Sequence, residues 1–284
     1  MKLRNVRRSS NIEDRRGRRG RTRRGGAIGG LGVGGVLLVL AIGYFTGIDV
    51  SPILGGSPSQ SVSSAPRDFS AAEQRASDFT SSVLATTEDV WSQVLPQQVG
   101  QEYVPPTLVL FSGQTTSSCG GATAATGPFY CPADQKAYLD TQFFATLSQR
   151  LGASGDFAAA YVIAHEVAHH VQNQLGVLGQ VDQARRASST AEANALTVRL
   201  ELQADCLSGV WATYVEGLLE PGDLEEAVNA ARQIGDDTLQ RNAGRVPQPH
   251  TFTHGTSEQR ARWFTKGYDA GEIGACDTFQ ARSL

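Results

Sequence analysis

Residues 161–172 read YVIAHEVAHHVQ, and this stretch sets the fold expected for the rest of the chain. His165 and His169 are four residues apart, and Glu166 directly follows the first of them. The surrounding Val, Ile and Ala residues predict a buried helix, on which positions four apart share one face about one turn from each other. Both imidazoles can therefore reach one cation. Glu166 lies about 100° further around the helix, where it can approach a water molecule bound to that cation.

The spacing H-E-x-x-H provides the division of labour that zinc hydrolysis requires. Neutral imidazoles hold Zn²⁺, the metal lowers the pKa of its water to about 7, and a carboxylate accepts the proton. A helix with incidental histidines is the alternative interpretation. It is disfavoured because three of the five histidines in the chain fall within positions 165–170. The motif therefore predicts a zinc site with Glu166 as general base.

Two ligands leave a catalytic zinc one protein group short of the usual three. The metzincin extension of the motif fails, since Gln172 stands where Gly is needed and Leu175 where the third His belongs. Downstream, VRLELQADCLSGVW (198–211) places Glu201 and Asp205 four apart on the next expected helix. We expect Glu201 to be the third ligand and Asp205 to orient a zinc-bound imidazole by accepting its remaining N–H. A solvated helix face is the alternative for this acidic pair.

Three other histidines need an interpretation. His250 and His254 are the remaining candidates for the third ligand. His254, in TFTHGTSEQR, is expected either to donate a hydrogen bond to a developing oxyanion or to belong to the cap of a helix that begins at Thr256. His170 points to a different helix face from the ligand pair, which favours a structural role.

The N-terminal part of the 284-residue chain differs in composition from the rest. Residues 1–24 hold eleven basic and two acidic side chains, and residues 27–47 form an uncharged run of 21 residues, about 30 Å long as a helix. The positive-inside rule then predicts a basic cytoplasmic segment (1–26), one transmembrane helix (27–47), a Ser/Pro/Gly-rich linker (48–68) and an extracytoplasmic domain (69–284).

Two alternatives compete with this N-terminal assignment. A cleaved signal peptide is disfavoured by the long basic region and the absence of a clear cleavage site. A nucleic-acid-binding arm is disfavoured because no aromatic residues interleave the arginines, so we expect no specific nucleic acid partner. Contact of the basic run with anionic lipid headgroups is the simpler expectation.

Four cysteines, Cys119, Cys131, Cys206 and Cys276, lie in the part of the chain predicted to be outside the cytoplasm, where disulfides persist. Three pairings are possible. Nearness in sequence favours Cys119–Cys131, which leaves Cys206 with Cys276. A cysteine zinc site is disfavoured because no C-x₂-C pair occurs.

The sequence predicts an α+β fold that is mainly α. Short strands are expected within 105–113 and 128–144, and Gln135 to Asp140 is the candidate for an edge strand that aligns substrate by backbone pairing. The apolar periodicity predicts helices over 70–95, 157–175, about 190–218, 223–236 and 256–269. Capping boxes are expected at the start of three of them, formed by Ser189 with Glu192, Asp223 with Glu226, and Thr256 with Gln259. Pro96 is expected to end the first of these helices.

Several blocks in the same order resemble the bacterial neutral zinc metallopeptidase family, also called YpfJ-like. They are RRSSNIEDRRG (7–17), CGGATAATGPFYCPADQKAYLD (119–140), GDFAAAYVIAHEVAHHVQ (155–172), RLELQADCLSGVW (199–211), FTHGTSEQRARWFTKGY (252–268) and ACDTF (275–279). The resemblance implies a membrane-anchored zincin-like domain with His165 and His169 as zinc ligands and Glu166 as catalytic base. Glu201 and Asp205 also resemble the E-x-x-x-D arrangement of gluzincin-type peptidases.

The sequence therefore predicts a membrane-anchored, zinc-dependent peptidase of gluzincin type that acts on a peptide or protein substrate outside the cytoplasm. The alternative hypothesis is a non-catalytic binding or scaffold domain that zinc stabilises. The presence of Glu166 favours the enzyme, and the substrate and oligomeric state stay open.

Overall fold

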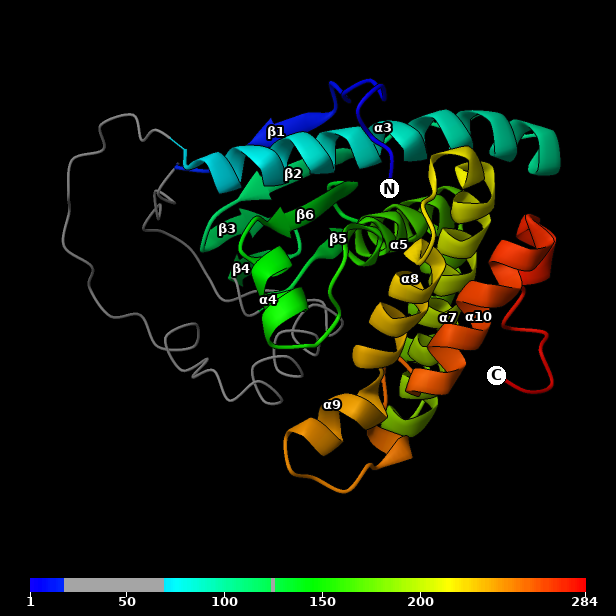
Figure 1. Ribbon diagram of the computed structural model, residues 1–284. Helices are drawn as coiled ribbons and strands as arrows, with labels where there is room; N and C mark the ends of the chain where they lie inside the picture. Colours follow the sequence, from blue (N-terminus) through cyan, green and yellow to red (C-terminus); the bar gives the residue numbers. More distant parts are fainter. Residues whose placement is uncertain (18–68, 124–125) are drawn as a thin grey trace.

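The computed structural model describes residues 1–17, 69–123 and 126–284, which form a small sheet at one end of a larger group of helices (Figure 1). The predicted class, α+β and mainly helical, is confirmed. The predicted transmembrane helix (27–47) and linker (48–68) lie outside the described residues. Within the part of the chain that the structure describes, no helix is both long enough and apolar enough to cross a membrane.

The strands belong to two sheets. The larger sheet has the order β1-β2-β6-β5, in which β1, β2 and β6 are parallel and β5 is antiparallel to β6. An antiparallel hairpin of β3 and β4 forms the second sheet. The strand bounds are β1 (Ile12–Asp14), β2 (Thr107–Phe111), β3 (Gln114–Ser117), β4 (Gly120–Thr123), β5 (Phe129–Cys131) and β6 (Lys136–Asp140).

The edge strand was predicted wrongly. Residues 136–140 of the proposed segment form β6, which is paired on both sides, by β2 and by β5. The strand beyond it, β5, lies at that end of the described sheet and packs next to the helix that carries the H-E-x-x-H motif. Strand order is set by partners distant in sequence, so the alternation of residues 135–140 could not separate an edge strand from a central one.

The helices agree with the apolar periodicity, with small shifts at their ends. The long ones are α3 (Ala71–Val99), α5 (Asp156–Gln174), α7 (Thr190–Tyr214), α8 (Asp223–Gln233) and α10 (Ser257–Ala270). The shorter ones are α4 (Phe143–Gln149), α6 (Val177–Arg186), α9 (Asp236–Asn242), η2 (Glu216–Leu218), η3 (Pro249–Thr251) and η4 (Ile273–Cys276).

Helix ends follow their local signals at most positions. Reciprocal capping boxes form at Ser189 with Glu192 and at Thr256 with Gln259, as predicted. The third predicted box is wrong, because Asp223 is already helical and Gly222 is the N-cap. Pro96 does not end α3, which continues to a left-handed cap at Gly100. A proline near the end of a helix removes one hydrogen bond, and packing of the remaining turns can offset that loss.

Helices α5, α7, α8 and α10 pack together, and α3 runs across them beside the sheet (Figure 1). Two glycines let the backbones of α7 and α10 approach closely. A Cβ atom at Gly209 would lie 2.1 Å from the carbonyl oxygen of Phe264, and one at Gly267 would lie 1.9 Å from that of Cys206. This close contact brings side chains of α10 against the buried face of α7.

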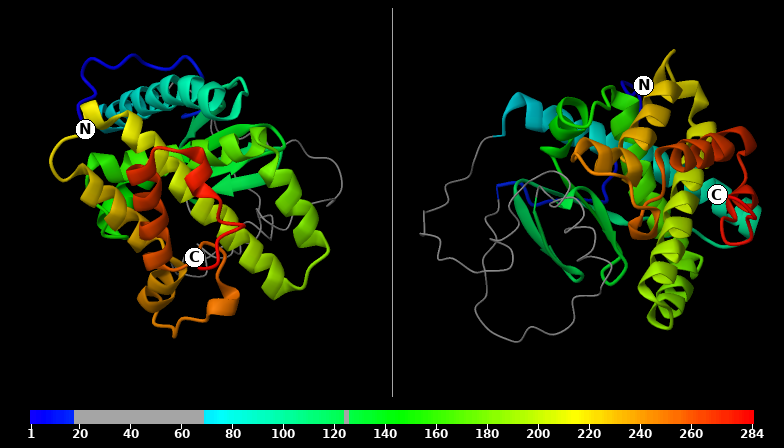
Figure 2. Two further views of the ribbon diagram at one scale, coloured as in Figure 1. Left: turned by 90° about the vertical axis from the view of Figure 1, so that its right-hand side faces the viewer. Right: turned by 90° about the horizontal axis from the view of Figure 1, so that it is seen from below.

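Both favoured disulfides are present, Cys119–Cys131 and Cys206–Cys276, with Cα–Cα distances of 5.8 and 5.5 Å. The second links α7 to η4 near the C-terminus. The residues after η4 then pass next to α7 (Figure 2), where the Arg199 guanidinium donates to the carbonyl oxygen of Thr278.

Residues 1–17 pack on the same body as residues 69–284. Strand β1 extends the sheet beside β2, and the rest of the segment lies along α3 (Figure 1). The sequence placed this segment in the cytoplasm and began the folded domain at Phe69. The described fold includes the segment, because its polar side chains find partners in α3 and the sheet that are distant in sequence.

Candidate active site

Helix α5 presents His165 and His169 on one face. Their ring centroids are 4.8 Å apart with the rings nearly perpendicular. His165 is 6% exposed and His169 is partly exposed, so the pair lies at the boundary between the core and solvent. This is the arrangement that a four-residue spacing on a helix predicts.

Helix α7 brings Glu201 to this pair. Its Oε2 lies 3.1 Å from the Nε2 atom of His165, and its Oε1 lies 3.5 Å from the Nε2 atom of His169. One potential ligand atom from each of the three residues falls within 4.8 Å of the others. Two imidazole nitrogens and one carboxylate oxygen form the donor set of a class of catalytic zinc sites.

The charges in this cluster also favour the binding of a cation. Burial by itself would raise the pKa of Glu201, but His169 and His165 hold that pKa well below its usual range. Burial would lower the pKa of His165, but Asp205 and Glu201 raise it to about 9. The two carboxylates therefore favour positive charge at the imidazoles, and a bound divalent cation would supply that charge.

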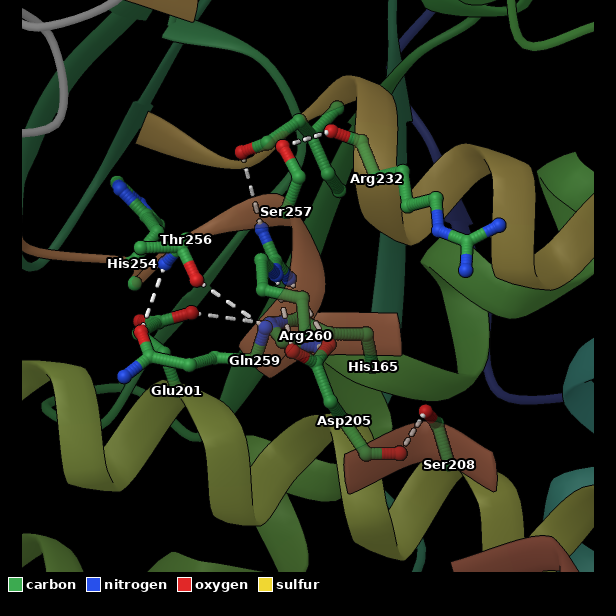
Figure 3. A network of polar contacts seen from close by, with 12 residues as sticks. His165, Glu201, Asp205, Ser208, Arg232, His254, Thr256, Ser257, Gln259 and Arg260 are labelled. Atoms are coloured by element: carbon green, nitrogen blue, oxygen red, sulfur yellow. Dashed lines mark hydrogen bonds and ion pairs between the residues drawn. The ribbon is translucent and has the colours of Figure 1, made fainter. Parts of the chain in front are cut away.

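Asp205 lies one turn further along α7 and is fully buried. Its Oδ1 is 2.9 Å from the Nδ1 atom of His165, on the side of the ring opposite Glu201 (Figure 3). Arg260 of α10 donates to both carboxylate oxygens at 2.9 Å, and the Tyr161 hydroxyl donates to Oδ1 at 2.5 Å. Burial opposes the ionised carboxylate, but Arg260 and His165 keep the pKa of Asp205 below its usual range.

Sequence reasoning did not assign roles to Tyr161 or Arg260. Tyr161 precedes His165 by four residues, so helical spacing alone places it on the same face of α5. Arg260 had no comparable signal, because α10 contains a second arginine and the close approach of α7 and α10 is a tertiary feature.

Gln172 is a further residue that the sequence left without a role. Its Oε1 atom lies 2.8 Å from the Nδ1 atom of His169, and its amide donates to the carbonyl oxygen of Leu200 and to Gln203. Because that amide nitrogen donates to α7, its oxygen is left to accept the ring N–H of His169. The three-residue spacing from His169 is the signal that could have identified it.

Glu166 is half-buried beside the two histidines. Burial raises its pKa, and the nearby His169 and His165 act in the opposite direction. Its place on α5, next to His165 and outside the three-residue cluster, agrees with the predicted offset around the helix.

His254 lies in the loop before α10, close enough for Glu201 to influence its pKa. Its Nδ1 atom is 3.3 Å from Asp236 Oδ1. The other oxygen of Asp236 accepts the backbone N–H groups of Thr253, His254 and Gly255 at 2.7, 2.6 and 3.1 Å. Burial would lower the pKa of His254, but Asp236 raises it. His254 does not cap α10, since Thr256 is the N-cap.

The two other histidines lie outside the cluster. His170 is buried and bonds to the Tyr130 hydroxyl at 3.0 Å and the carbonyl oxygen of Val104 at 2.7 Å, so it ties α5 to the sheet. Burial lowers its pKa. His250 is exposed in η3, away from the three-residue cluster.

A second group of acidic residues, Asp156, Asp223 and Glu226, already has protein partners. The α-ammonium of Met1 lies 2.9 Å from Asp156 and 3.2 Å from Asp223, and the Glu226 carboxylate accepts the backbone N–H of Phe157 at 3.0 Å. These contacts account for the acidic group within the described structure.

The fold and the cluster define a protein of the H-E-x-x-H type, in which two adjacent helices bring together three residues that could hold a metal ion. Residues 1–279 match the family described as "Putative neutral zinc metallopeptidase". The chain belongs to this family.

Curated relatives agree with the family assignment. The protein YpfJ of Escherichia coli strain K12 is 47% identical over 287 residues, which cover 98% of this chain and 99% of YpfJ. The protein Rv2575 of Mycobacterium tuberculosis strain H37Rv is 44% identical over 218 residues, 71% of each chain. No solved structure is significantly similar to this chain.

Proposed function

We propose that the protein is a zinc-dependent peptidase in which His165, His169 and Glu201 hold the metal. The observation that carries this proposal is the convergence of these three side chains from α5 and α7, with candidate ligand atoms within 4.8 Å of one another. The membership of the chain in a family of zinc metallopeptidases supports it. When bound, Zn²⁺ would polarise the scissile carbonyl and lower the pKa of a water molecule to about 7.

Glu166 is the general base of the proposed reaction. Its carboxylate takes a proton from the attacking water as the water oxygen bonds to the carbonyl carbon of the substrate. The same carboxyl group then gives the proton to the peptide nitrogen as the C–N bond breaks. The products are a carboxylic acid and an amine, which become a carboxylate and an ammonium group by proton transfer, so one water molecule accounts for all the atoms.

The residues behind the ligands fix the imidazoles. Asp205 lies against the Nδ1 atom of His165, and Gln172 accepts from the Nδ1 atom of His169, which leaves each Nε2 atom facing Glu201. Partners of this kind fix the tautomer of a ligand and increase its basicity. Arg260 balances the charge of Asp205, so that this buried carboxylate stays ionised.

His254 is the proposed donor to the carbonyl oxygen of the substrate, where negative charge develops. Asp236 holds the surrounding loop through three backbone N–H groups and lies against the Nδ1 atom of His254. Asp236 raises the pKa of His254 and so favours the protonated imidazole, in which Nε2 also carries a hydrogen and can donate it to the substrate. Asp236 is a positioning residue, since it acts through the imidazole.

Replacement of Asp236 by asparagine tests this role. The carboxylate raises the pKa of His254, so its loss should lower that pKa and the protonated imidazole should disappear at a lower pH. We expect His254→Ala to lower kcat by about 10²–10³-fold. Asp236→Asn should lower kcat less than His254→Ala does. It should also move the alkaline limb of the pH profile of kcat to lower pH.

The matched control for this prediction is Asp237→Asn, which removes the neighbouring carboxylate. Asp237 bonds to Ser257 and not to His254, so the alkaline limb should stay in place. An unchanged pH profile in Asp236→Asn would contradict the proposed action of Asp236 on His254.

The location of the protein is also a proposal. The two disulfides support an oxidising compartment for the domain, outside the cytoplasm. Membrane attachment through residues 27–47 stays a prediction from the sequence, as does the absence of a specific nucleic acid partner.

Removal of the metal tests the proposed function as a whole. The purified chain should cleave a mixture of quenched fluorescent peptides, lose this activity after chelation and dialysis, and regain it when zinc is added. Magnesium should not restore cleavage, because it prefers oxygen ligands in octahedral geometry. Peptide hydrolysis that survives complete metal removal would rule out the proposal.

A further inference from the structure

We infer that residues 1–17 are an integral part of the metallopeptidase domain and lie on the same side of any membrane as the metal site. Strand β1 pairs in parallel with β2 through Ile12 and Leu108, Glu13 and Val109, and Asp14 and Leu110. Two further backbone bonds continue the pairing beyond the strand, from Leu108 N to Asn11 O at 2.8 Å and from Arg15 N to Leu110 O at 2.7 Å. The segment thus covers backbone groups of β2 that would otherwise lack partners.

A buried carboxylate in α3 depends on the same segment. Glu88 is 5% exposed, and its donors are the Ser9 hydroxyl at 2.5 Å, the Asn11 amide at 2.8 Å and the Arg7 guanidinium at 2.8 Å. All three donors belong to residues 1–17. The segment thus supplies the hydrogen-bond donors that a buried carboxylate requires, and its removal would leave Glu88 without them. The sequence of α3 is therefore adapted to the docked segment.

Four arginines of the segment, Arg7, Arg8, Arg15 and Arg16, are also paired within the protein. Arg7 and Arg8 form ion pairs with Asp89 and Asp78 of α3, at 2.6 and 2.8 Å. The Arg16 guanidinium is buried and lies 4.2 Å from the centre of the Phe69 ring. These arginines were expected to contact anionic lipid, but in the structure they contact α3 and the Phe69 ring.

Across the sheet, Lys136 of β6 reaches the segment as well. Its ammonium group lies 2.7 Å from the Glu13 carboxylate, which Arg15 also contacts at 2.8 Å. These two cations lower the pKa of Glu13 to about 2, so this pairing persists over the physiological pH range.

The docked segment constrains the topology. A single crossing by residues 27–47 would place residues 1–17 and residues 69–284 on opposite sides of a hydrocarbon layer about 30 Å thick. Hydrogen bonds of 2.7 to 2.8 Å between β1 and β2 cannot form across that distance. A single crossing and the docked segment therefore exclude each other. We place residues 1–17 and the domain that begins at residue 69 on one side, in contrast to the cytoplasmic N-terminus that the charge pattern predicts.

Cysteine labelling of the full chain in cells tests this inference. Ser10 and Gln183 are both exposed, the first in the segment and the second on α6 of the domain. The variants Ser10→Cys and Gln183→Cys each add one thiol to a chain whose four native cysteines form disulfides. A maleimide that does not cross the cytoplasmic membrane is applied before and after permeabilisation of that membrane.

We expect both variants to be labelled to the same extent before permeabilisation. Labelling of both only after permeabilisation would still support a common side, while contradicting the extracytoplasmic location under the proposed function. Labelling of one variant before permeabilisation and of the other only afterwards would overturn the inference.

Proteolysis of the purified full chain tests the docking itself. We expect Glu88→Ala to increase the rate of tryptic cleavage after Arg15 or Arg16 at least about tenfold, because opening of the segment becomes easier. The control Asp89→Ala removes only an exposed ion pair with Arg7 and should change the rate little. Equally fast cleavage of the wild type and Glu88→Ala would show that the segment is not docked.

Discussion

Replacement of Glu166 by glutamine should abolish most peptide hydrolysis and leave zinc binding unchanged. The amide keeps the shape of the side chain but cannot accept the proton of the attacking water. We expect kcat to fall by about 10²–10⁴-fold, the range for loss of a general base. Steady-state cleavage of a peptide substrate and the zinc content of the same preparation measure the two effects together.

The matched control is Glu225→Gln on the exposed face of α8, which makes the same chemical change away from the site. It should leave kcat and zinc content at the wild-type values. If Glu166→Gln cleaves peptides at the wild-type rate, Glu166 is not the base. If the wild type binds zinc but no peptide is cleaved, the alternative hypothesis of a zinc-stabilised scaffold domain takes its place.

Replacement of Glu201 by alanine should remove zinc from the protein. The change deletes the carboxylate that lies 3.1 Å from His165 and 3.5 Å from His169, and leaves the two imidazoles without their shared negative partner. Loss of a residue that only orients a ligand typically weakens metal binding by about 10–100-fold. Loss of a ligand should exceed this, so we expect the zinc affinity of Glu201→Ala to fall by more than about 100-fold.

Asp205→Asn provides the comparison within the same helix. It keeps all three ligands and alters the contacts of this side chain with His165, Arg260 and Tyr161, so its zinc affinity should fall by the amount typical of a residue that orients a ligand, about 10–100-fold. Competition with a chromophoric chelator measures both affinities, and thermal melting shows whether each variant is folded. Equal zinc affinity in the wild type and Glu201→Ala would refute the assignment of the third ligand.

The sequence was sufficient for the parts of the site that depend on helical spacing. The four-residue intervals between His165 and His169 and between Glu201 and Asp205 place each pair on one face of its helix. Because a catalytic zinc usually has three protein ligands, the sequence also predicted that the helix with Glu201 lies beside the helix with the two histidines. The structure brings His165, His169 and Glu201 together as that reasoning required.

The partners of these residues were harder to predict because they depend on tertiary packing. Arg260 reaches Asp205 only because Gly209 and Gly267 let α7 and α10 approach closely. Asp236 acts on His254 from the start of a separate short helix. Neither contact leaves a signal in local periodicity.

The N-terminal segment shows the limit of composition as a guide. A basic run before an apolar stretch is typical of a cytoplasmic flank, and that rule considers only the Lys and Arg residues beside the stretch. It does not consider Ser9 and Asn11, whose contacts with Glu88 join the segment to α3. The same arginines that suggest contact with lipid are used to pair carboxylates of the protein.

The zinc ligands can be identified directly by X-ray absorption at the zinc edge, recorded on the purified full chain with its metal content measured in parallel. We expect one zinc ion per chain, bound by two imidazole nitrogens at about 2.0–2.1 Å and a carboxylate oxygen at about 2.0–2.2 Å. Absence of zinc after preparation in zinc-containing buffer, or a first shell that contains sulfur, would contradict the site formed by α5 and α7.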